Sequence, residues 1–340
     1  MTELRIGIIG SGYMGRTYAE CVARYNTHAH LVAVAGGSRA PGLAADYGVT
    51  AEPSVEALLN RADVDAVIIT SPQSAHCEQT QQAARHGKHI LVEKPMATST
   101  AECRQMIEAC RSAGVALSVI KPWRYRGSTR GAFESIQRGD IGDVRMINLW
   151  WLYPRIPFIG KKWFRDPKEG GLFLDAGSHC FDYLRWIAGS EATRLYAQVA
   201  NYNGDGETPR STMTTLAFKN GVMASLWLSY EVPGPGWEHT DFRARIVGSA
   251  GELDVHGYGA LQLGSGDAWA TLYQQAPMDY INRPMERVRL EGFFLMTQDW
   301  IDALRDGREP PISGEDGLAA VAMVEAGYRS SALGQAVDPR

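Results

Sequence analysis

The chain has 340 residues, of which 45% are hydrophobic and 21% are charged, and its formal net charge is −4. This length allows two domains with a substantial core. The weakly negative charge does not indicate a basic surface that would bind nucleic acid. No run of about twenty apolar residues is present, so we expect no segment that spans a membrane.

The N-terminus and the cysteines both point to the cytoplasm. A strand is predicted to begin at residue 4, which leaves no room for a signal peptide. The five cysteines are scattered and include no Cys-x-x-Cys pair. An odd, dispersed set indicates buried free thiols in a reducing compartment, and neither disulfides nor a zinc site. We therefore expect a cytoplasmic protein.

The first third of the chain alternates predicted strands with predicted helices. Strands are expected at residues 4–9, 30–35, 65–70, 89–92 and 115–119. Helices fill the intervals, the last of them over Thr100 to Ala113. Such alternation is typical of right-handed crossovers and a parallel sheet, so this part is predicted to be an α/β domain.

The pattern changes near residue 125. A series of β-prone segments with alternating polarity and turn signals follows, at residues 144–152, 193–200, 212–218, 222–230, 242–247 and 252–256. Helices are expected at residues 177–187 and 293–305. We therefore predict a domain boundary between residues 1–124 and 125–340, the second part being an α+β domain with a large, mainly antiparallel open sheet.

Three glycines open a helix directly after the first predicted strand. Gly10, Gly12 and Gly15 permit a tight turn, close approach of a pyrophosphate and close helix packing. The helix N-terminus adds amide donors for the same anion. With a strand before, a helix after and a second strand at the right distance, they predict a dinucleotide site, so residues 1–124 are expected to form a Rossmann NAD(P)-binding domain.

The end of the second strand bears on the choice of dinucleotide. A site selective for NAD places Asp or Glu there to bind the ribose hydroxyls, whereas this chain has Gly36-Gly37-Ser38-Arg39. Ser38 and Arg39 could bind a 2′-phosphate, which favours NADP over NAD. Alternatively, Arg39 stacks on the adenine and either cofactor binds.

A lysine ends the fourth predicted strand, in the tripeptide Glu93-Lys94-Pro95. Ligands of open α/β sheets bind outside the C-terminal ends of the strands, where an ammonium group can polarise an oxygen beside a nicotinamide ring. Asp175, His179 and Asp182 are spaced four and three apart, so on a helix they share one face. No further ligand cluster accompanies them, so a zinc site is not favoured and no metal is expected.

These side chains suit the removal of a hydride from an alcohol. The hydroxyl proton must leave at or before the transition state, and a histidine, which titrates near neutrality, suits that task. Lys94 would stabilise the developing alkoxide, while Asp175 would hold the histidine or a substrate hydroxyl. The structural alternative is that Asp175 caps a helix and that His179 is a satisfied core imidazole.

Several motifs, in order along the chain, resemble the glucose-fructose oxidoreductase, inositol dehydrogenase and rhizopine catabolism (Gfo/Idh/MocA) family. They are the glycines of residues 10–15, Thr70-Ser71-Pro72 with His76, Glu93-Lys94-Pro95, and residues 170–182. The resemblance runs to about residue 330. It implies reversible oxidation of a secondary alcohol on a sugar or cyclitol by the catalytic trio Lys94, Asp175 and His179. It also implies that the second domain's sheet carries substrate on one side and commonly a subunit interface on the other, so a homodimer or homotetramer is expected.

The remaining site predictions follow the fingerprint, the strand ends and the family motifs. The cofactor-binding residues are predicted to be Gly10, Gly12, Tyr13, Met14, Gly15, Ser38, Arg39, Ser71, Pro72, His76, Glu93, Lys94 and Lys121. The substrate-binding residues are predicted to be Lys94, Lys121, Trp123, Tyr125, Trp163, Arg165, Asp175 and His179. Arg124-Tyr125 matches an Arg-aromatic pair of the family, while Lys121-Pro122 departs from its pattern and could reflect a particular substrate.

The sequence thus predicts a sugar or cyclitol dehydrogenase that uses NAD or NADP. Three rival classes remain open: a non-catalytic sensor that only binds the dinucleotide, a redox-neutral NAD-dependent glycoside hydrolase of the same architecture, and a reductase of the dihydrodiol or biliverdin type. The presence of Lys94, Asp175 and His179 together counts against the sensor.

Overall fold

The structure, a computed structural model, describes residues 3–154, 166–202, 208–233, 241–279 and 282–340. The chain divides into two compact units. The first unit comprises Met1–Tyr125 and Met278–Leu318, and the second comprises Arg126–Pro277 and Ala319–Arg340.

The first unit contains a six-stranded parallel sheet in the order β3-β2-β1-β4-β5-β6. Its strands are β1 (Leu4–Ile9), β2 (Ala29–Ala35), β3 (Thr50–Ala51), β4 (Ala66–Ile69), β5 (His89–Val92) and β6 (Leu117–Val119). The strand order reverses next to β1, which is where open sheets of this kind bind ligands. The predicted parallel α/β fold is confirmed.

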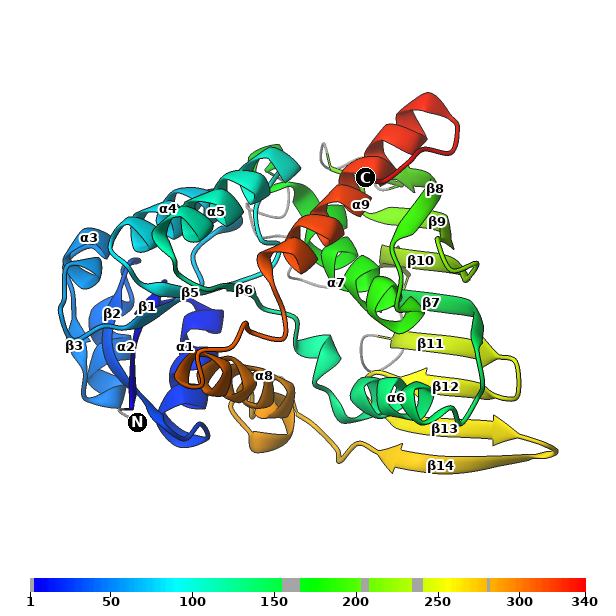
Figure 1. Cartoon of the computed structure of the whole chain (residues 1–340), viewed down its shortest axis with the longest axis horizontal. Helices are drawn as coiled ribbons and strands as arrows, with labels where there is room; N and C mark the ends of the chain where they lie inside the picture. Colours follow the sequence, from blue (N-terminus) through cyan, green and yellow to red (C-terminus); the bar gives the residue numbers. More distant parts are fainter. Residues whose placement is uncertain (1–2, 155–165, 203–207, 234–240, 280–281) are drawn as a thin grey trace. The chain divides into compact units, whose positions relative to one another are not determined.

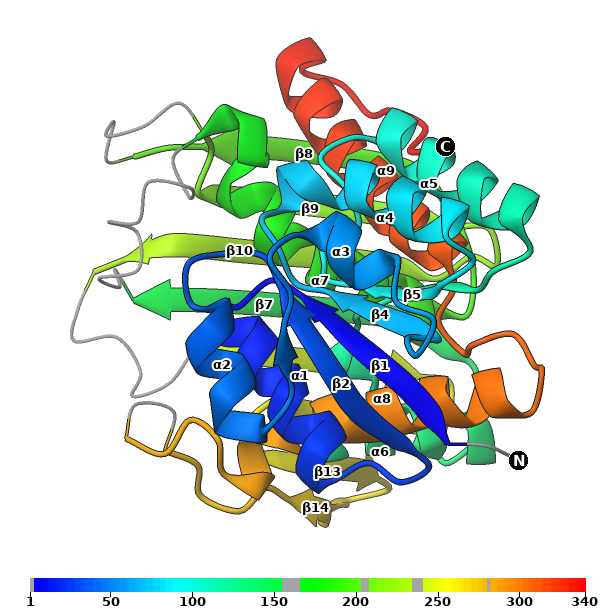
Figure 2. The same cartoon turned by 90° about the vertical axis from the view of Figure 1, so that its left-hand side faces the viewer.

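Helices cover both faces of this sheet, as a parallel sheet requires. They are α1 (Tyr13–Arg24), α2 (Ala40–Tyr47), α3 (Val55–Leu59), α4 (His76–Arg85), α5 (Thr100–Ala113) and α8 (Arg287–Arg305). Figure 1 shows α4 and α5 on one side of the sheet and α1 and α8 on the other. In Figure 2, α1 and α2 lie against β1 and β2.

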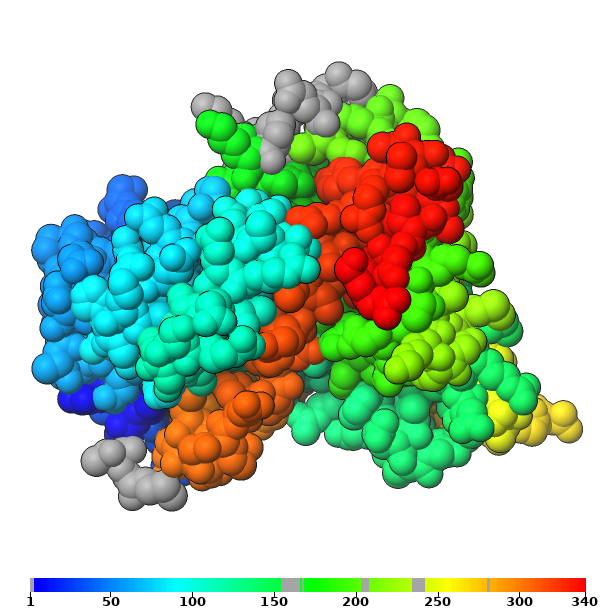
Figure 3. Space-filling model, turned by 45° about the horizontal axis from the view of Figure 1, so that its top comes forward, coloured from blue at the N-terminus to red at the C-terminus, as the bar shows by residue number. Residues whose placement is uncertain are grey.

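Residues 278–318 belong with the first unit, whereas the sequence analysis placed them in the second domain. Their helix α8 packs on α1, and Figure 3 shows this orange segment lying against the blue N-terminal part of the chain. The buried Arg289 donates hydrogen bonds to the Thr17 hydroxyl at 3.1 Å and to the Pro284 carbonyl at 2.7 Å. Farther along, the Ser118 hydroxyl donates to the Ile312 carbonyl at 2.6 Å. These long-range contacts leave no local trace in the sequence.

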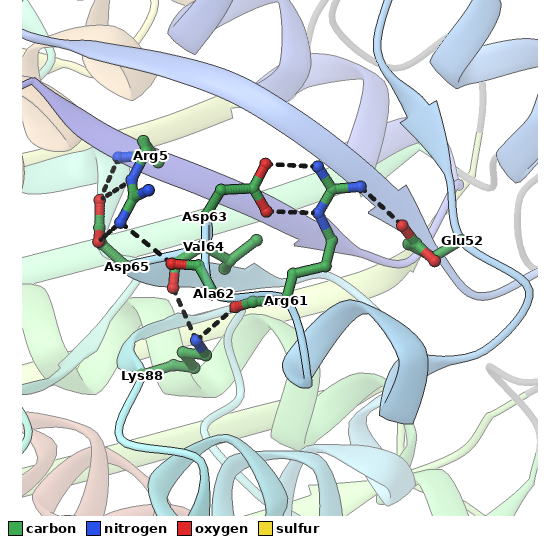
Figure 4. A network of polar contacts seen from close by, with 8 residues as sticks. All are labelled: Arg5, Glu52, Arg61, Ala62, Asp63, Val64, Asp65 and Lys88. Atoms are coloured by element: carbon green, nitrogen blue, oxygen red, sulfur yellow. Dashed lines mark hydrogen bonds and ion pairs between the residues drawn. The ribbon is translucent and has the colours of Figure 1, made fainter.

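An ion network ties together the N-terminal ends of β1, β4 and β5 (Figure 4). The Arg5 guanidinium binds both carboxylate oxygens of Asp65, at 2.9 and 2.7 Å, and these hydrogen bonds hold the pKa of Asp65 below its ordinary value. Lys88 donates to the carbonyls of Arg61 and Val64 at 2.8 and 2.7 Å. The network connects the strands at their N-terminal ends, on the side of the sheet opposite to the C-terminal strand ends.

The second unit is built on an eight-stranded mixed sheet in the order β14-β13-β12-β11-β7-β10-β9-β8 (Figure 1). Neighbouring strands are antiparallel except for β7 and β10, which pair in parallel. The strands are β7 (Val144–Pro154), β8 (Ala192–Ala200), β9 (Ser211–Phe218), β10 (Met223–Val232), β11 (Asp241–Gly248), β12 (Glu252–His256), β13 (Ala260–Ser265) and β14 (Ala268–Gln274). The predicted large, mainly antiparallel sheet is confirmed, and β13 and β14 are additions to it.

Helices α6 (Gly127–Arg138) and α7 (Gly171–Ala188) pack on one side of this sheet (Figure 1). The last helix, α9 (Gly314–Leu333), begins in the first unit and continues in the second. The strand residues that point away from α7 include large apolar side chains with exposures of 46 to 65%: Met146, Met213, Met223 and Trp227. Of the helices that the structure describes, none has the length and apolar character needed to cross a membrane.

Candidate active site

The glycine-rich turn is packed so closely that two of its positions accept no side chain. A Cβ on Gly10, whose φ is +109°, would lie 2.7 Å from Thr70, and a Cβ on Gly15 would lie 2.0 Å from the Gly10 carbonyl oxygen. A Cβ on Gly12 would instead meet a guanidinium nitrogen of Arg39 at 3.7 Å, with no other atom of the described residues within 4 Å. The turn is therefore tight against the sheet but open at Gly12, as close approach of a pyrophosphate requires.

The start of α1 offers backbone donors at this opening. Gly12 is the N-cap and has no side chain to cap the first turn, so its amides are left for a ligand. Tyr13 is exposed, with the Arg289 guanidinium 4.6 Å from its ring centroid, and Met14 is half-buried. These residues fit a bound dinucleotide, which would supply the nicotinamide that takes or gives a hydride.

The end of β2 presents a cation and no carboxylate to this turn. Gly36 and Gly37 both have positive φ, and Ser38 and Arg39 after them are exposed. The contact between Arg39 and the Gly12 position places a guanidinium over the glycine-rich turn. The arrangement suits an anionic group on the adenosine half of the cofactor.

The loops after β4 and β5 are joined through a buried histidine. His76 is 1% exposed; its Nε2 lies 2.9 Å from the carbonyl oxygen of Ser71 and its Nδ1 lies 3.0 Å from that of Pro95. The Lys94 amide donates to the Glu93 carboxylate at 2.8 Å. Pro72 begins the short helical turn before His76. The imidazole thus links the loop after β4 to the backbone directly after Lys94, and direct contact of His76 with the cofactor stays a prediction.

Lys121 follows β6 as Lys94 follows β5, and these two strands are neighbours. Lys121 is 1% exposed, and its amide donates to the Met296 sulfur at 3.1 Å. Trp123 and Tyr125 are also buried. Arg124, from the family's Arg-aromatic pair, forms an ion pair with Asp316 at 3.1 Å. It therefore anchors the start of α9 within the first unit.

The predicted acid–base residues lie on α7 in the second unit. Asp175, His179 and Asp182 share one face of that helix, as their spacing predicted. Asp175 is half-buried, while His179 and Asp182 are 8% and 2% exposed. The His179 ring makes an edge contact with the Trp151 ring at a centroid distance of 5.7 Å, which orients the imidazole on the inner face of β7.

A pair of tyrosines near Asp175 was missed by the sequence analysis. Tyr153 on β7 and Tyr230 on β10 stack with their ring centroids 4.4 Å apart and their planes at 8°. Burial raises the pKa of Tyr230 well above its ordinary value, and the negative charge of Asp175 raises it further. The alternation of side chains along β7 could have placed Tyr153 on the inner face of the sheet, because residues 151 and 153 are two apart and point to the same side of the strand.

Some predicted residues cannot be placed. Trp163 and Arg165, predicted to bind substrate, lie outside the described residues. The first unit thus holds the dinucleotide cradle and Lys94, and the second unit holds Asp175 and His179.

Comparison with known proteins agrees with this reading of the two units. The family described as "Oxidoreductase family, NAD-binding Rossmann fold" matches residues 4–121, and the "GFO/IDH/MocA C-terminal domain" matches residues 129–254. Inositol 2-dehydrogenase of Rhizobium meliloti is 28% identical over 338 residues, covering 97% of each chain. The 1,5-anhydro-D-fructose reductase of Ensifer adhaerens is 27% identical and covers 98% of each chain.

A solved structure extends the match to three dimensions. Aldose-aldose oxidoreductase from Caulobacter crescentus, complexed with glycerol, superimposes with a TM-score of 0.86 at 25% identity and covers 99% of each chain. The two family matches together span most of this sequence, in the order that the motifs predicted. This chain therefore belongs to the GFO/IDH/MocA family of oxidoreductases and carries the family's NAD-binding Rossmann fold.

Proposed function

We propose that the protein is a dehydrogenase that oxidises a secondary alcohol of a sugar or cyclitol, reversibly, with NAD or NADP. The observation that carries this proposal is the combination of a dinucleotide cradle, a lysine at the end of β5, and a carboxylate and an imidazole on one face of α7. The relatives named as inositol 2-dehydrogenase and 1,5-anhydro-D-fructose reductase support the substrate class.

Each of the three residues has one role in the proposed reaction. His179 accepts the proton of the substrate hydroxyl as the C–O bond becomes a carbonyl. A dinucleotide held at the glycine-rich turn and the start of α1 would supply the hydride acceptor. The Lys94 ammonium stabilises the negative charge that develops on that oxygen. Asp175 orients the histidine or a neighbouring hydroxyl. In the reverse direction His179 returns the proton.

The proposal is tested by following cofactor reduction across inositols, pyranoses and anhydrosugars with NAD and with NADP. We expect one class of polyol to give turnover well above the others. Absence of turnover with every polyol would favour a sensor. Release of an aglycone from a glycoside without net cofactor reduction would identify a redox-neutral hydrolase.

We further propose that NADP is the preferred cofactor. The exposed Arg39 lies over the glycine-rich turn, and residues 36–39 contain no carboxylate that would repel a 2′-phosphate. An arginine binds phosphate through charge-assisted, often bidentate hydrogen bonds.

Arg39→Ala should raise the KM for NADP about tenfold or more, as expected for a lost charge-assisted hydrogen bond, and should leave the KM for NAD nearly unchanged. Steady-state kinetics with both cofactors measures this. An equal rise for NAD would assign Arg39 to adenine stacking, and the preference for NADP would then have to come from elsewhere.

We also propose that the exposed face of the second unit's sheet is the interface of a homodimer or homotetramer. Met146 and Met223 face each other across β7 and β10, and Trp227 pairs with Met213 across β10 and β9. The two pairs lie on the same face of the sheet, on either side of Ser225 and Asn148, and exposed large apolar side chains gathered on one face are typical of an interface. A cytoplasmic location fits the five buried, free cysteines.

Trp227→Lys should shift the protein toward the monomer, because a charge in the centre of an apolar interface is desolvated without a partner. Light scattering coupled to gel filtration measures the shift. Leu333→Lys is the control, since Leu333 is similarly exposed but lies at the end of α9. A wild-type protein that is monomeric at micromolar concentration would contradict the proposal.

A further inference from the structure

We propose that Arg289 is a positioning residue for the dinucleotide, because it braces the first turn of α1, where the pyrophosphate would bind. This inference rests on the proposed function and deepens it: it gives a residue of α8 a part in cofactor binding, although α8 is distant from the fingerprint along the chain. Arg289 is 3% exposed, so we assign its effect to the contacts that it makes with α1 and not to contact with the cofactor.

Arg289 meets the first turn of α1 through the spacing of residues on both helices. Tyr13 and Thr17 are four residues apart on α1, so their side chains share one face. Arg289 and Phe293 share a face of α8 for the same reason. The Cζ atom of Arg289 lies 4.6 Å from the ring centroid of Tyr13 and 5.2 Å from that of Phe293. A guanidinium over an aromatic ring is attracted by the electrons of the ring, so Arg289 restrains the side chain with which α1 begins.

The Thr17 hydroxyl joins the same guanidinium to the backbone of Tyr13. Both terminal nitrogens of Arg289 donate to Thr17 Oγ1 at 3.1 Å, and this hydroxyl donates to the Tyr13 carbonyl oxygen at 3.1 Å. A hydroxyl has one proton to donate and two lone pairs that accept, so these three hydrogen bonds use its full capacity. Thr17 is fully buried, which makes the loss of these bonds costly. Tyr13 is therefore held both at its ring and at its carbonyl group.

The guanidinium is anchored on a second side by the segment that leads into α8. One terminal nitrogen of Arg289 also donates to the Pro284 carbonyl oxygen at 2.7 Å. The donors of an arginine are fixed in one plane, so the bonds to Thr17 and Pro284 together define how this plane lies. The contact of the guanidinium with the Tyr13 ring is thus set by hydrogen bonds on both sides.

The turn that Arg289 braces begins at Gly12, the open position of the glycine-rich turn. No side chain caps the helix there, and the first amides of an α-helix have no acceptor within the helix. These amides are the natural donors for a pyrophosphate. A turn that is already held in place loses less conformational freedom when the ligand binds, so the brace should raise the affinity for the cofactor.

Arg289→Met tests this role. We expect the dissociation constant of the preferred cofactor, NAD or NADP, to rise about tenfold, the order of one buried hydrogen bond. Isothermal titration calorimetry without substrate measures it. Because Arg289 is not one of the proposed catalytic residues, kcat at saturating cofactor should stay close to the wild-type value.

Arg287→Met is the matched control on the same helix. The Cζ atom of Arg287 lies 5.8 Å from the ring centroid of Tyr25 and 5.1 Å from that of Phe294. Tyr25 is the C-cap of α1, so this cation contacts the opposite end of the same helix. Arg287→Met should leave the dissociation constant unchanged.

Two further measurements separate positioning from a general loss of stability. Without cofactor, hydrogen exchange in a peptide that covers the first turn of α1 should become faster in Arg289→Met and stay unchanged in Arg287→Met. Thr17→Val removes the hydroxyl that links Arg289 to the Tyr13 carbonyl and should weaken cofactor binding as Arg289→Met does. Thr17→Ser keeps a hydroxyl and should bind the cofactor nearly as the wild type does. This pair replaces Arg289→Met if that variant folds poorly.

The outcomes distinguish this inference from the proposed function. A wild-type protein that binds neither NAD nor NADP overturns both, whereas one that binds cofactor but oxidises no polyol overturns the proposed function alone. Unchanged affinity in Arg289→Met, or an equal loss in Arg287→Met, overturns the bracing role alone. Weaker binding in Arg289→Met and Thr17→Val, with Thr17→Ser and Arg287→Met close to the wild type, supports it.

Discussion

Lys94→Ala is expected to lower kcat by about a hundredfold or more, because it removes the charge that would stabilise the developing alkoxide. Cofactor affinity should largely survive, since the glycine-rich turn and the start of α1 do not depend on the lysine side chain. Turnover of the best polyol measures the first effect, and titration of cofactor fluorescence measures the second.

A control for this variant lies at the other end of the same strand. Lys88 precedes β5 and donates its hydrogen bonds to the Arg61 and Val64 carbonyls (Figure 4). Lys88→Ala should lower thermal stability but leave kcat close to the wild-type value. Unchanged turnover in Lys94→Ala would remove Lys94 from the mechanism.

His179→Gln should lower kcat/KM by about 10² to 10⁴, the usual contribution of a general base. A base works in its neutral form, so wild-type kcat/KM should fall as the pH is lowered and the imidazole becomes protonated. In the variant this acid limb should disappear, leaving a flat, low profile. Initial rates between about pH 5 and pH 9 cover the relevant range.

His30→Gln is the matched control for the pH profile. His30 is on β2, is largely exposed and lies 3.2 Å from Glu3. Its loss should leave both the rate and the acid limb in place. If the limb persists in His179→Gln at a reduced rate, another group takes the proton, and His179 would be retained only as a residue that binds or orients the substrate.

The strands of both sheets could be predicted because their signals are local. Buried strands such as β4 and β5 are short apolar runs bounded by breakers, and β7 to β12 alternate apolar with polar residues. The position of Lys94 could be predicted in the same way, because it depends only on where one strand ends. The family motifs then supplied the roles that spacing alone could not.

The start of α7 was predicted six residues too late, at Gly177 instead of Gly171. Gly170 and Gly171 both have positive φ, and such a pair resembles a turn in the sequence. In the structure Gly170 is the N-cap and the helix begins at Gly171. A Cβ on Gly171 would lie 2.4 Å from Thr208, so no side chain fits at this position. Tertiary packing thus demands a glycine where the sequence suggested a loop.

Two further elements lacked a readable pattern. Most of β14 is exposed, so it shows no alternation between a buried and an open face. Helix α9 was not predicted; it passes from one compact unit into the other, so no single apolar stripe marks it. The stacking of Tyr153 on Tyr230 could be predicted only in part. Alternation places each ring on the inner face of its own strand, but the contact depends on β10 pairing in parallel with β7, and these strands are far apart along the chain.

Residues 126–277 of the second unit lie between the two segments of the first, so this chain cannot be assembled in the order in which it is synthesised. By the time the ribosome reaches α8, it has already produced every strand of both sheets. Until then α1 lacks the helix that packs on it, and Thr17 lacks the guanidinium of Arg289. The nucleotide-binding half, although encoded first, is therefore completed only after every strand of the second unit has been made, and a fragment cut at residue 124 would keep the fingerprint but lose its support.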